Sequence, residues 1–258
     1  MIGQIVALAT DLTGQTQLWL WSAVLVFLRV GAAMALVPAF GEMVVPVRVR
    51  LGLALAFTAI VLPTSLVPVA TPPGPGAAGV EVLVGLMLGI GLRLFVLAVQ
   101  TAAVIAANAM SLSQLFGGAG PEPQPAMGNL LTMSALALAV TLGLHVKLAG
   151  LFIASYQLFP AGALPLSADA ARWGIAQVSG FFVLAFTLAA PFALAAMVYN
   201  LALGVISKAM PQLMVVMVGA PLLTGGAMFL MILVLPFLLS IWHGALDAFL
   251  LQPARIAP

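Results

Sequence analysis

Residues 228–239 read MFLMILVLPFLL, and residues 53–62 read LALAFTAIVL. Both stretches are continuously apolar and lack the alternation of apolar and polar residues that marks the strands of a membrane β-barrel. The 258-residue chain holds only eight basic and six acidic residues, and 64% of its residues are hydrophobic. A soluble domain carries about 25% charged residues, whereas this chain carries 5%. Because so few charges cannot cover a solvated surface, the sequence predicts an all-α polytopic membrane protein.

Apolar runs that are long enough to cross a bilayer, which takes ~20 residues of helix, recur along the chain. We expect about six long helical segments, kinked by proline and packed as hairpins in a single membrane-embedded domain, residues 1–258. The runs cover residues 18–40, 51–69, 81–116, 129–159, 175–206 and 213–250. Pro191, Pro221 and Pro236 fall inside the last two. Proline within a membrane frees backbone carbonyls that neighbouring helices must satisfy, so these runs predict tight packing inside a larger assembly.

Two glycines in the third run, Gly85 and Gly89, stand four residues apart. Small residues at this spacing share one face of a helix and let two helix backbones approach closely. We therefore expect this face to pack against another helix.

The candidates for ionisable residues at the middle of the membrane are Arg29, Arg93 and Glu81. A charged side chain within the membrane costs free energy unless it is paired with an opposite charge or hydrated. For Arg29 three alternatives stay open. It contacts a partner subunit or the carbonyls of a helix break, with Glu42 or Glu81 as candidate acids; it reaches to the membrane interface; or it binds a substrate.

The connector between the first two runs carries Arg48 and Arg50, the densest basic spot in the chain. The positive-inside rule places such a connector in the cytoplasm. Residues 1–14 lack a basic region and a cleavage site, so we expect them to be a retained amphipathic or re-entrant segment and not a signal peptide.

Catalytic and metal-binding patterns are missing from the sequence. It contains no cysteine, no HExxH, no GxSxG and no GxxxxGK[ST], and its acidic residues stand singly. We therefore expect no enzyme, no catalytic residue, no metal and no cofactor. A formal net charge of +2 also argues against nucleic-acid binding. A secondary transporter or small-solute permease remains the alternative, although a mid-membrane acid for ion coupling is not evident.

Six stretches, in this order, resemble one known family. They are FLRVGAAM (27–34), PAFG (38–41), VPVRVRLGLA (45–54), EVLVGLMLG (81–89), LGVISKAMPQL (203–213) and GAPL (219–222). Together they resemble the FliR family of flagellar export-gate proteins, called SctT in injectisomes, over nearly the whole chain.

The resemblance implies a structural subunit of the type III protein export gate in the bacterial inner membrane, at the base of the flagellum or injectisome. Its partners would be FliP-like, FliQ-like and FlhB-like membrane subunits and the lipid bilayer, and its cargo unfolded export substrates. The family pattern makes Phe116, Gly117 and Gly118, at the start of a Gly/Pro loop, candidates for a pore plug. Candidates for assembly or for a helix break are Arg29, Arg48, Arg50, Glu81, Pro211 and Gln212.

Overall fold

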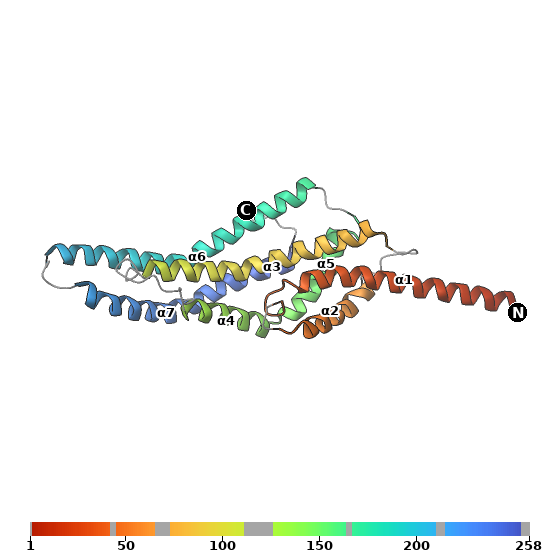
Figure 1. Cartoon of the computed structure of the whole chain (residues 1–258), viewed down its shortest axis with the longest axis horizontal. Coiled ribbons are helices and arrows are strands. Elements are labelled where there is room, and N and C mark those ends of the chain that lie inside the picture. The colour runs from red at the N-terminus through yellow and green to blue at the C-terminus, as the bar shows by residue number, and fades with distance from the viewer. Residues whose placement is uncertain are drawn as a thin grey trace. The chain divides into compact units, whose positions relative to one another are not determined.

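The computed structural model describes the backbone of residues 2–41, 45–64, 73–110, 126–163, 167–209 and 215–253. Over these residues the chain forms helices and turns and no strand, which confirms the predicted all-α class (Figure 1). The helices are α1 (Ile2–Met34), α2 (Val47–Val61), the 3₁₀ helix η1 (Leu62–Thr64), α3 (Pro75–Met110), α4 (Ala126–Thr141), α5 (Leu144–Leu158), α6 (Ser167–Ala209) and α7 (Val215–Leu251).

Five helical segments within the described residues are long and apolar enough to cross a membrane. They are Gln15–Met34, Val47–Thr64, Pro75–Ala109, Ala168–Ala209 and Gly225–Leu251. The helices α4 and α5 pass the same test together as one broken span, which brings the number to six. The chain is therefore a polytopic membrane protein, as the long apolar runs predict.

The predicted segments were wrong in one place. The fourth run was expected as one helix, but the chain breaks it after Thr141, where Gly143 adopts a left-handed backbone conformation with φ of 81°. A right-handed helix cannot continue through this conformation, and glycine adopts it at little cost. Pro191 lies within α6 and does not end it, which agrees with the predicted run over residues 175–206.

The chain divides into two compact units. Unit 1 comprises Met1–Arg93, Gly143–Gln177 and Asp247–Pro258. Its core includes buried aliphatic residues of α1 and α5, and Phe57 of α2 meets Phe152 of α5 edge to face with ring centres 5.8 Å apart. Lys147 of α5 also forms an ion pair of 2.6 Å with Asp247 of α7.

Unit 2 comprises Leu94–Leu142 and Val178–Leu246. Trp242 of α7 is almost fully buried here, and its indole N–H donates a hydrogen bond of 2.9 Å to the carbonyl oxygen of Phe95 in α3. A buried indole needs such an acceptor, so this bond ties α7 to α3. One face of α6 in this unit is apolar and exposed, with the side chains of Leu194 and Leu201 63% and 69% accessible.

Candidate functional site

The candidate site begins with a close crossing of α3 over α1 in unit 1. A methyl group at Gly85 would collide with the backbone carbonyl of Arg29, and one at Gly89 would lie 2.9 Å from the carbonyl oxygen of Ala33. The prediction that this glycine face packs against another helix is confirmed. Glu81 lies one helical turn before Gly85 on the same face of α3, so the close crossing brings its carboxylate toward α1.

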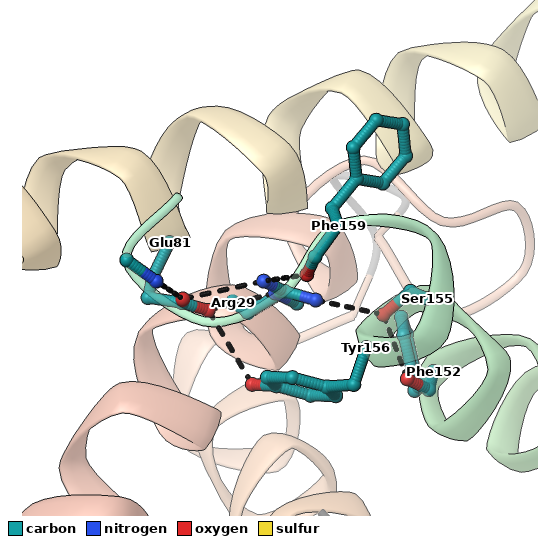
Figure 2. A network of polar contacts seen from close by, with 7 residues as sticks. Arg29, Glu81, Phe152, Ser155, Tyr156 and Phe159 are labelled. Carbon is teal, nitrogen blue, oxygen red and sulfur yellow. Dashed lines mark hydrogen bonds and ion pairs between the residues drawn. The ribbon is translucent and has the colours of Figure 1, made fainter. Parts of the chain in front are cut away.

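Arg29 of α1 and Glu81 of α3 form a fully buried ion pair (Figure 2). The Arg29 Nε lies 2.7 Å from Glu81 Oε2, and its Nη2 lies 3.2 Å from Glu81 Oε1. Two parallel N–H to oxygen bonds of this kind make a forked contact, which fixes the orientation of both groups and strengthens the pair. Of the two acids considered for Arg29, the structure therefore places Glu81 against it.

The C-terminal end of α5 supplies further partners for Arg29. The Nη1 of Arg29 donates to Ser155 Oγ at 3.2 Å, and the Nη2 of Arg29 donates to the carbonyl oxygen of Phe159 at 2.9 Å. The Ser155 hydroxyl donates its own proton to the Phe152 carbonyl at 2.7 Å, so its lone pairs face Arg29. The carbonyls of the last turn of a helix have no partner within the helix, and Arg29 satisfies one just beyond that turn.

Tyr156 and Gly162 complete the network on the side of Glu81. The Arg29 guanidinium carbon lies 3.8 Å from the centre of the Tyr156 ring, a cation–π distance. The Tyr156 hydroxyl donates to Glu81 Oε2 at 3.4 Å, and the backbone N–H of Gly162 donates to Glu81 Oε1 at 2.9 Å. Gly162 has a left-handed φ of 69°, a conformation that glycine adopts readily, so the turn after α5 can direct its N–H at the carboxylate.

This network binds parts of the chain to one another. The Arg29 guanidinium and the Glu81 carboxylate direct their hydrogen bonds at each other, at α5 and at the turn after it. Removing one partner of a buried pair leaves an uncompensated charge and costs about 3–5 kcal/mol. The arrangement therefore joins α1, α3 and the end of α5 through pairs of residues that are 52 to 130 positions apart in the chain. Among the described residues, no group of three His, Asp or Glu side chains could hold a metal ion.

The other predicted site residues lie elsewhere. Arg48 is exposed in the first turn of α2. Arg50 donates from Nε and Nη2 to the carbonyl oxygen of Val45, at 3.3 and 3.2 Å, and so holds the turn that precedes α2. Glu42, the other acid considered for Arg29, lies outside the residues that the structure describes. So do the remaining predicted site residues, Phe116, Gly117, Gly118, Pro211 and Gln212.

Sequence reasoning missed Ser155, Tyr156 and Gly162. A signal for the first two was present, because Ser-Tyr interrupts an apolar run a few residues before Pro160, and the chain has only two tyrosines. A polar pair at such a position indicates that something buried needs hydrogen bonds. No comparable signal marked Gly162, whose contribution is a backbone N–H.

Comparison with known proteins agrees with the resemblance of the six sequence stretches to the FliR family. The sequence model of the family described as "Bacterial export proteins, family 1" matches residues 20–249. The chain is 33% identical over 235 residues to the flagellar biosynthetic protein FliR of Caulobacter vibrioides, covering 88% of this chain and 93% of the relative. It is 31% identical over 216 residues to FliR of Escherichia coli, covering 82% and 83%.

Proposed function

Since this chain belongs to the bacterial export proteins of family 1 and is a membrane component of the flagellar export apparatus, we propose that it forms part of the wall of the export channel. In this proposal the whole chain, residues 1–258, acts as one membrane-embedded domain in the bacterial inner membrane. It assembles with FliP-like, FliQ-like and FlhB-like subunits, and unfolded export substrates pass through the assembly. The chain itself catalyses no reaction.

The observation that carries the proposal is the family match combined with the apolar surface of α6 and α7. Large apolar side chains on the parts of α6 and α7 that belong to unit 2 are more than half exposed. They are Leu194, Met197, Val198, Leu201, Val205, Met228, Phe229, Ile232, Leu233 and Phe237. An apolar helix face must be covered by lipid or by another protein, and a subunit of a multi-subunit channel meets that need with neighbouring subunits.

The buried network argues against a permease. A transporter that couples solute movement to ions needs ionisable groups facing a water-filled path near the middle of the membrane. Arg29 and Glu81 are instead fully buried, and they hydrogen-bond to each other and to the end of α5. They therefore suit a role in holding the subunit together during assembly.

Co-purification tests the proposal directly. The chain is expressed alone and together with FliP-like and FliQ-like subunits from the same bacterium, extracted in mild detergent, and analysed by size-exclusion chromatography and mass spectrometry. We expect a monodisperse complex only when the subunits are co-expressed. A monodisperse solitary chain that moves a small solute across liposomes would support the permease instead.

A charge on the exposed face gives a sharper version of this experiment. Leu201→Lys places an ammonium group on the apolar face of α6, where burial against a partner would desolvate it. We expect it to reduce the yield of the complex at unchanged expression. Ala168→Lys adds the same charge to an exposed position beside Asp169 in the first turn of α6 and serves as the control, with yield as in the wild type.

A further inference from the structure

An apolar groove opens between α1 and α2 in unit 1. Its volume is about 390 Å³, within the size range of small-molecule sites. Phe27 and Leu51 contribute walls, while Gly31, Ala35 and Ala54 contribute little or no side chain, which leaves the space open. A methyl group built at Gly31 would have only the Phe27 ring, 3.9 Å away, as a neighbour.

Among the residues that the structure describes, Arg50 is the one charged residue that lines this groove. It lies in the first turn of α2, which contains no acidic residue and holds a second cation, the exposed Arg48. The Nε and Nη2 of Arg50 bond to a single carbonyl oxygen, that of Val45. A guanidinium carries five donors, so Arg50 retains donors for a second acceptor.

The position of Arg50 along α2 matches the boundary between the apolar and polar layers of a membrane. Residues Val47–Thr64 form a candidate span, and the side chains of Leu51, Leu55 and Ile60 on α2 are about half exposed. The arginines stand at the start of this apolar face, where a spanning helix meets lipid headgroups. Basic pockets between membrane helices at this depth attract anionic lipid headgroups.

We propose that this groove binds an anionic glycerophospholipid, with one acyl chain between α1 and α2 and the phosphate on Arg50. The apolar walls match the acyl chain, and the guanidinium of Arg50 matches the phosphate charge. Arg48 adds positive potential without lining the groove. The inference goes beyond the proposed function, because the lipid contact itself needs only that the first turn of α2 reach the headgroup layer.

Native mass spectrometry of the complex with its export subunits, released from detergent, tests the proposal. The probes are phosphatidylglycerol and phosphatidylcholine with the same palmitoyl and oleoyl chains. We expect phosphatidylglycerol to be retained in preference. A basic residue near an anionic headgroup is worth ~1 kcal/mol, so Arg50→Gln should lower its retention about fivefold. The retention of phosphatidylcholine, whose choline cation offsets the phosphate charge, should fall less. Gly31→Leu, which fills the groove, should lower the retention of both lipids.

Two further variants separate charge from fold. Arg50 also bonds to the Val45 carbonyl, so Arg50→Gln removes a charge and a structural contact together. Arg50→Lys keeps the charge but loses the two guanidinium bonds to that carbonyl, and it should retain the preference for phosphatidylglycerol. Arg172→Gln removes an exposed arginine of α6, which pairs with Asp169, and should change nothing.

Four results would overturn the proposal. They are equal retention of the two lipids by the wild type, loss of the preference in Arg50→Lys, an effect of Arg172→Gln as large as that of Arg50→Gln, and unchanged retention in Gly31→Leu. A photoreactive benzoylphenylalanine at Ala35, in the groove, adds a direct readout. Cross-linking to phosphatidylglycerol supports the proposal, whereas cross-linking to an export subunit shows that protein fills the groove.

Discussion

The Arg29 guanidinium carbon lies 3.8 Å from the centre of the Tyr156 ring. The ring and the Glu81 carboxylate are thus both in contact with the same buried cation. A buried charge in a chain with so few ionic groups is stable only when its surroundings replace the hydration it has lost. These two contacts, together with the carbonyl of Phe159 and the hydroxyl of Ser155, provide that replacement.

Replacing Arg29 by Ala should strongly destabilise the chain. The Glu81 carboxylate would remain buried without its cation, which costs about 3–5 kcal/mol. We expect a lower midpoint of thermal unfolding in detergent and a lower yield of the complex with FliP-like and FliQ-like subunits. Lys147→Ala is the matched control, since it breaks a partly exposed ion pair that should be worth at most about 1 kcal/mol.

The double variant Arg29→Met with Glu81→Leu checks the cause. Both charges are removed together, so no unpaired charge remains, and apolar replacements of buried pairs are often tolerated. We expect this variant to be more stable than Arg29→Ala. If the double variant were the less stable of the two, the loss in Arg29→Ala would have to come from lost packing, and not from the unpaired carboxylate.

Tyr156 should act mainly through its ring. Tyr156→Phe removes only a long hydrogen bond of 3.4 Å to Glu81, which should cost less than about 1 kcal/mol. Tyr156→Leu also removes the ring over the guanidinium, a contact worth ~2 kcal/mol when desolvated. Thermal unfolding of the two variants side by side measures the difference. Equal losses would assign the role of Tyr156 to its hydroxyl.

Gly85→Ala should push α3 away from α1. The added methyl group would meet the Arg29 carbonyl and lie 2.9 Å from Ala32 Cβ, and overpacking of this kind costs about 1–3 kcal/mol. The same substitution at Gly150, on α5, meets no atom of the described residues within 4 Å and should stabilise the helix by up to about 1 kcal/mol. Opposite shifts in the unfolding midpoint are therefore expected. A gain in stability for both variants would show that the two helices can separate without loss.

Much of this arrangement could be predicted from the sequence, because it depends on composition and local spacing. The scarcity of charge and the long apolar runs predict membrane helices, and the spacing of Gly85 and Gly89 predicts a close helix contact. Glu81 lies four residues before Gly85, on the same helix face. Its selection over Glu42 as the acid near Arg29 could not be predicted, because it depends on where α3 crosses α1.

The break between α4 and α5 escaped prediction for a local reason. Glycine is common in membrane helices, so Gly143 gave no sign that it, among 25 glycines, would take a left-handed conformation and end a helix. Pro191 is a helix breaker by its local chemistry, yet α6 continues through it, as the predicted run over residues 175–206 has it. Neighbouring helices and local adjustments of the backbone can satisfy the carbonyl that a proline frees in a membrane helix, and one sequence cannot reveal those neighbours.

Deleting Phe116–Ala119 should leave assembly intact and raise the resting leak of ions through the complex. The expected plug combines a bulky aromatic side chain with two glycines, which allow the backbone to take conformations closed to other residues. Removing it would widen the closed state without touching the Arg29 network. Conductance of the purified complex in planar bilayers measures the leak, and co-purification of the subunits monitors assembly. The control is a deletion of equal length in the same Gly/Pro loop, residues 121–124, which keeps Phe116, Gly117 and Gly118 and should show the wild-type leak. Equal leaks in the two deletions would assign the effect to loop length and contradict a plug at Phe116–Gly118.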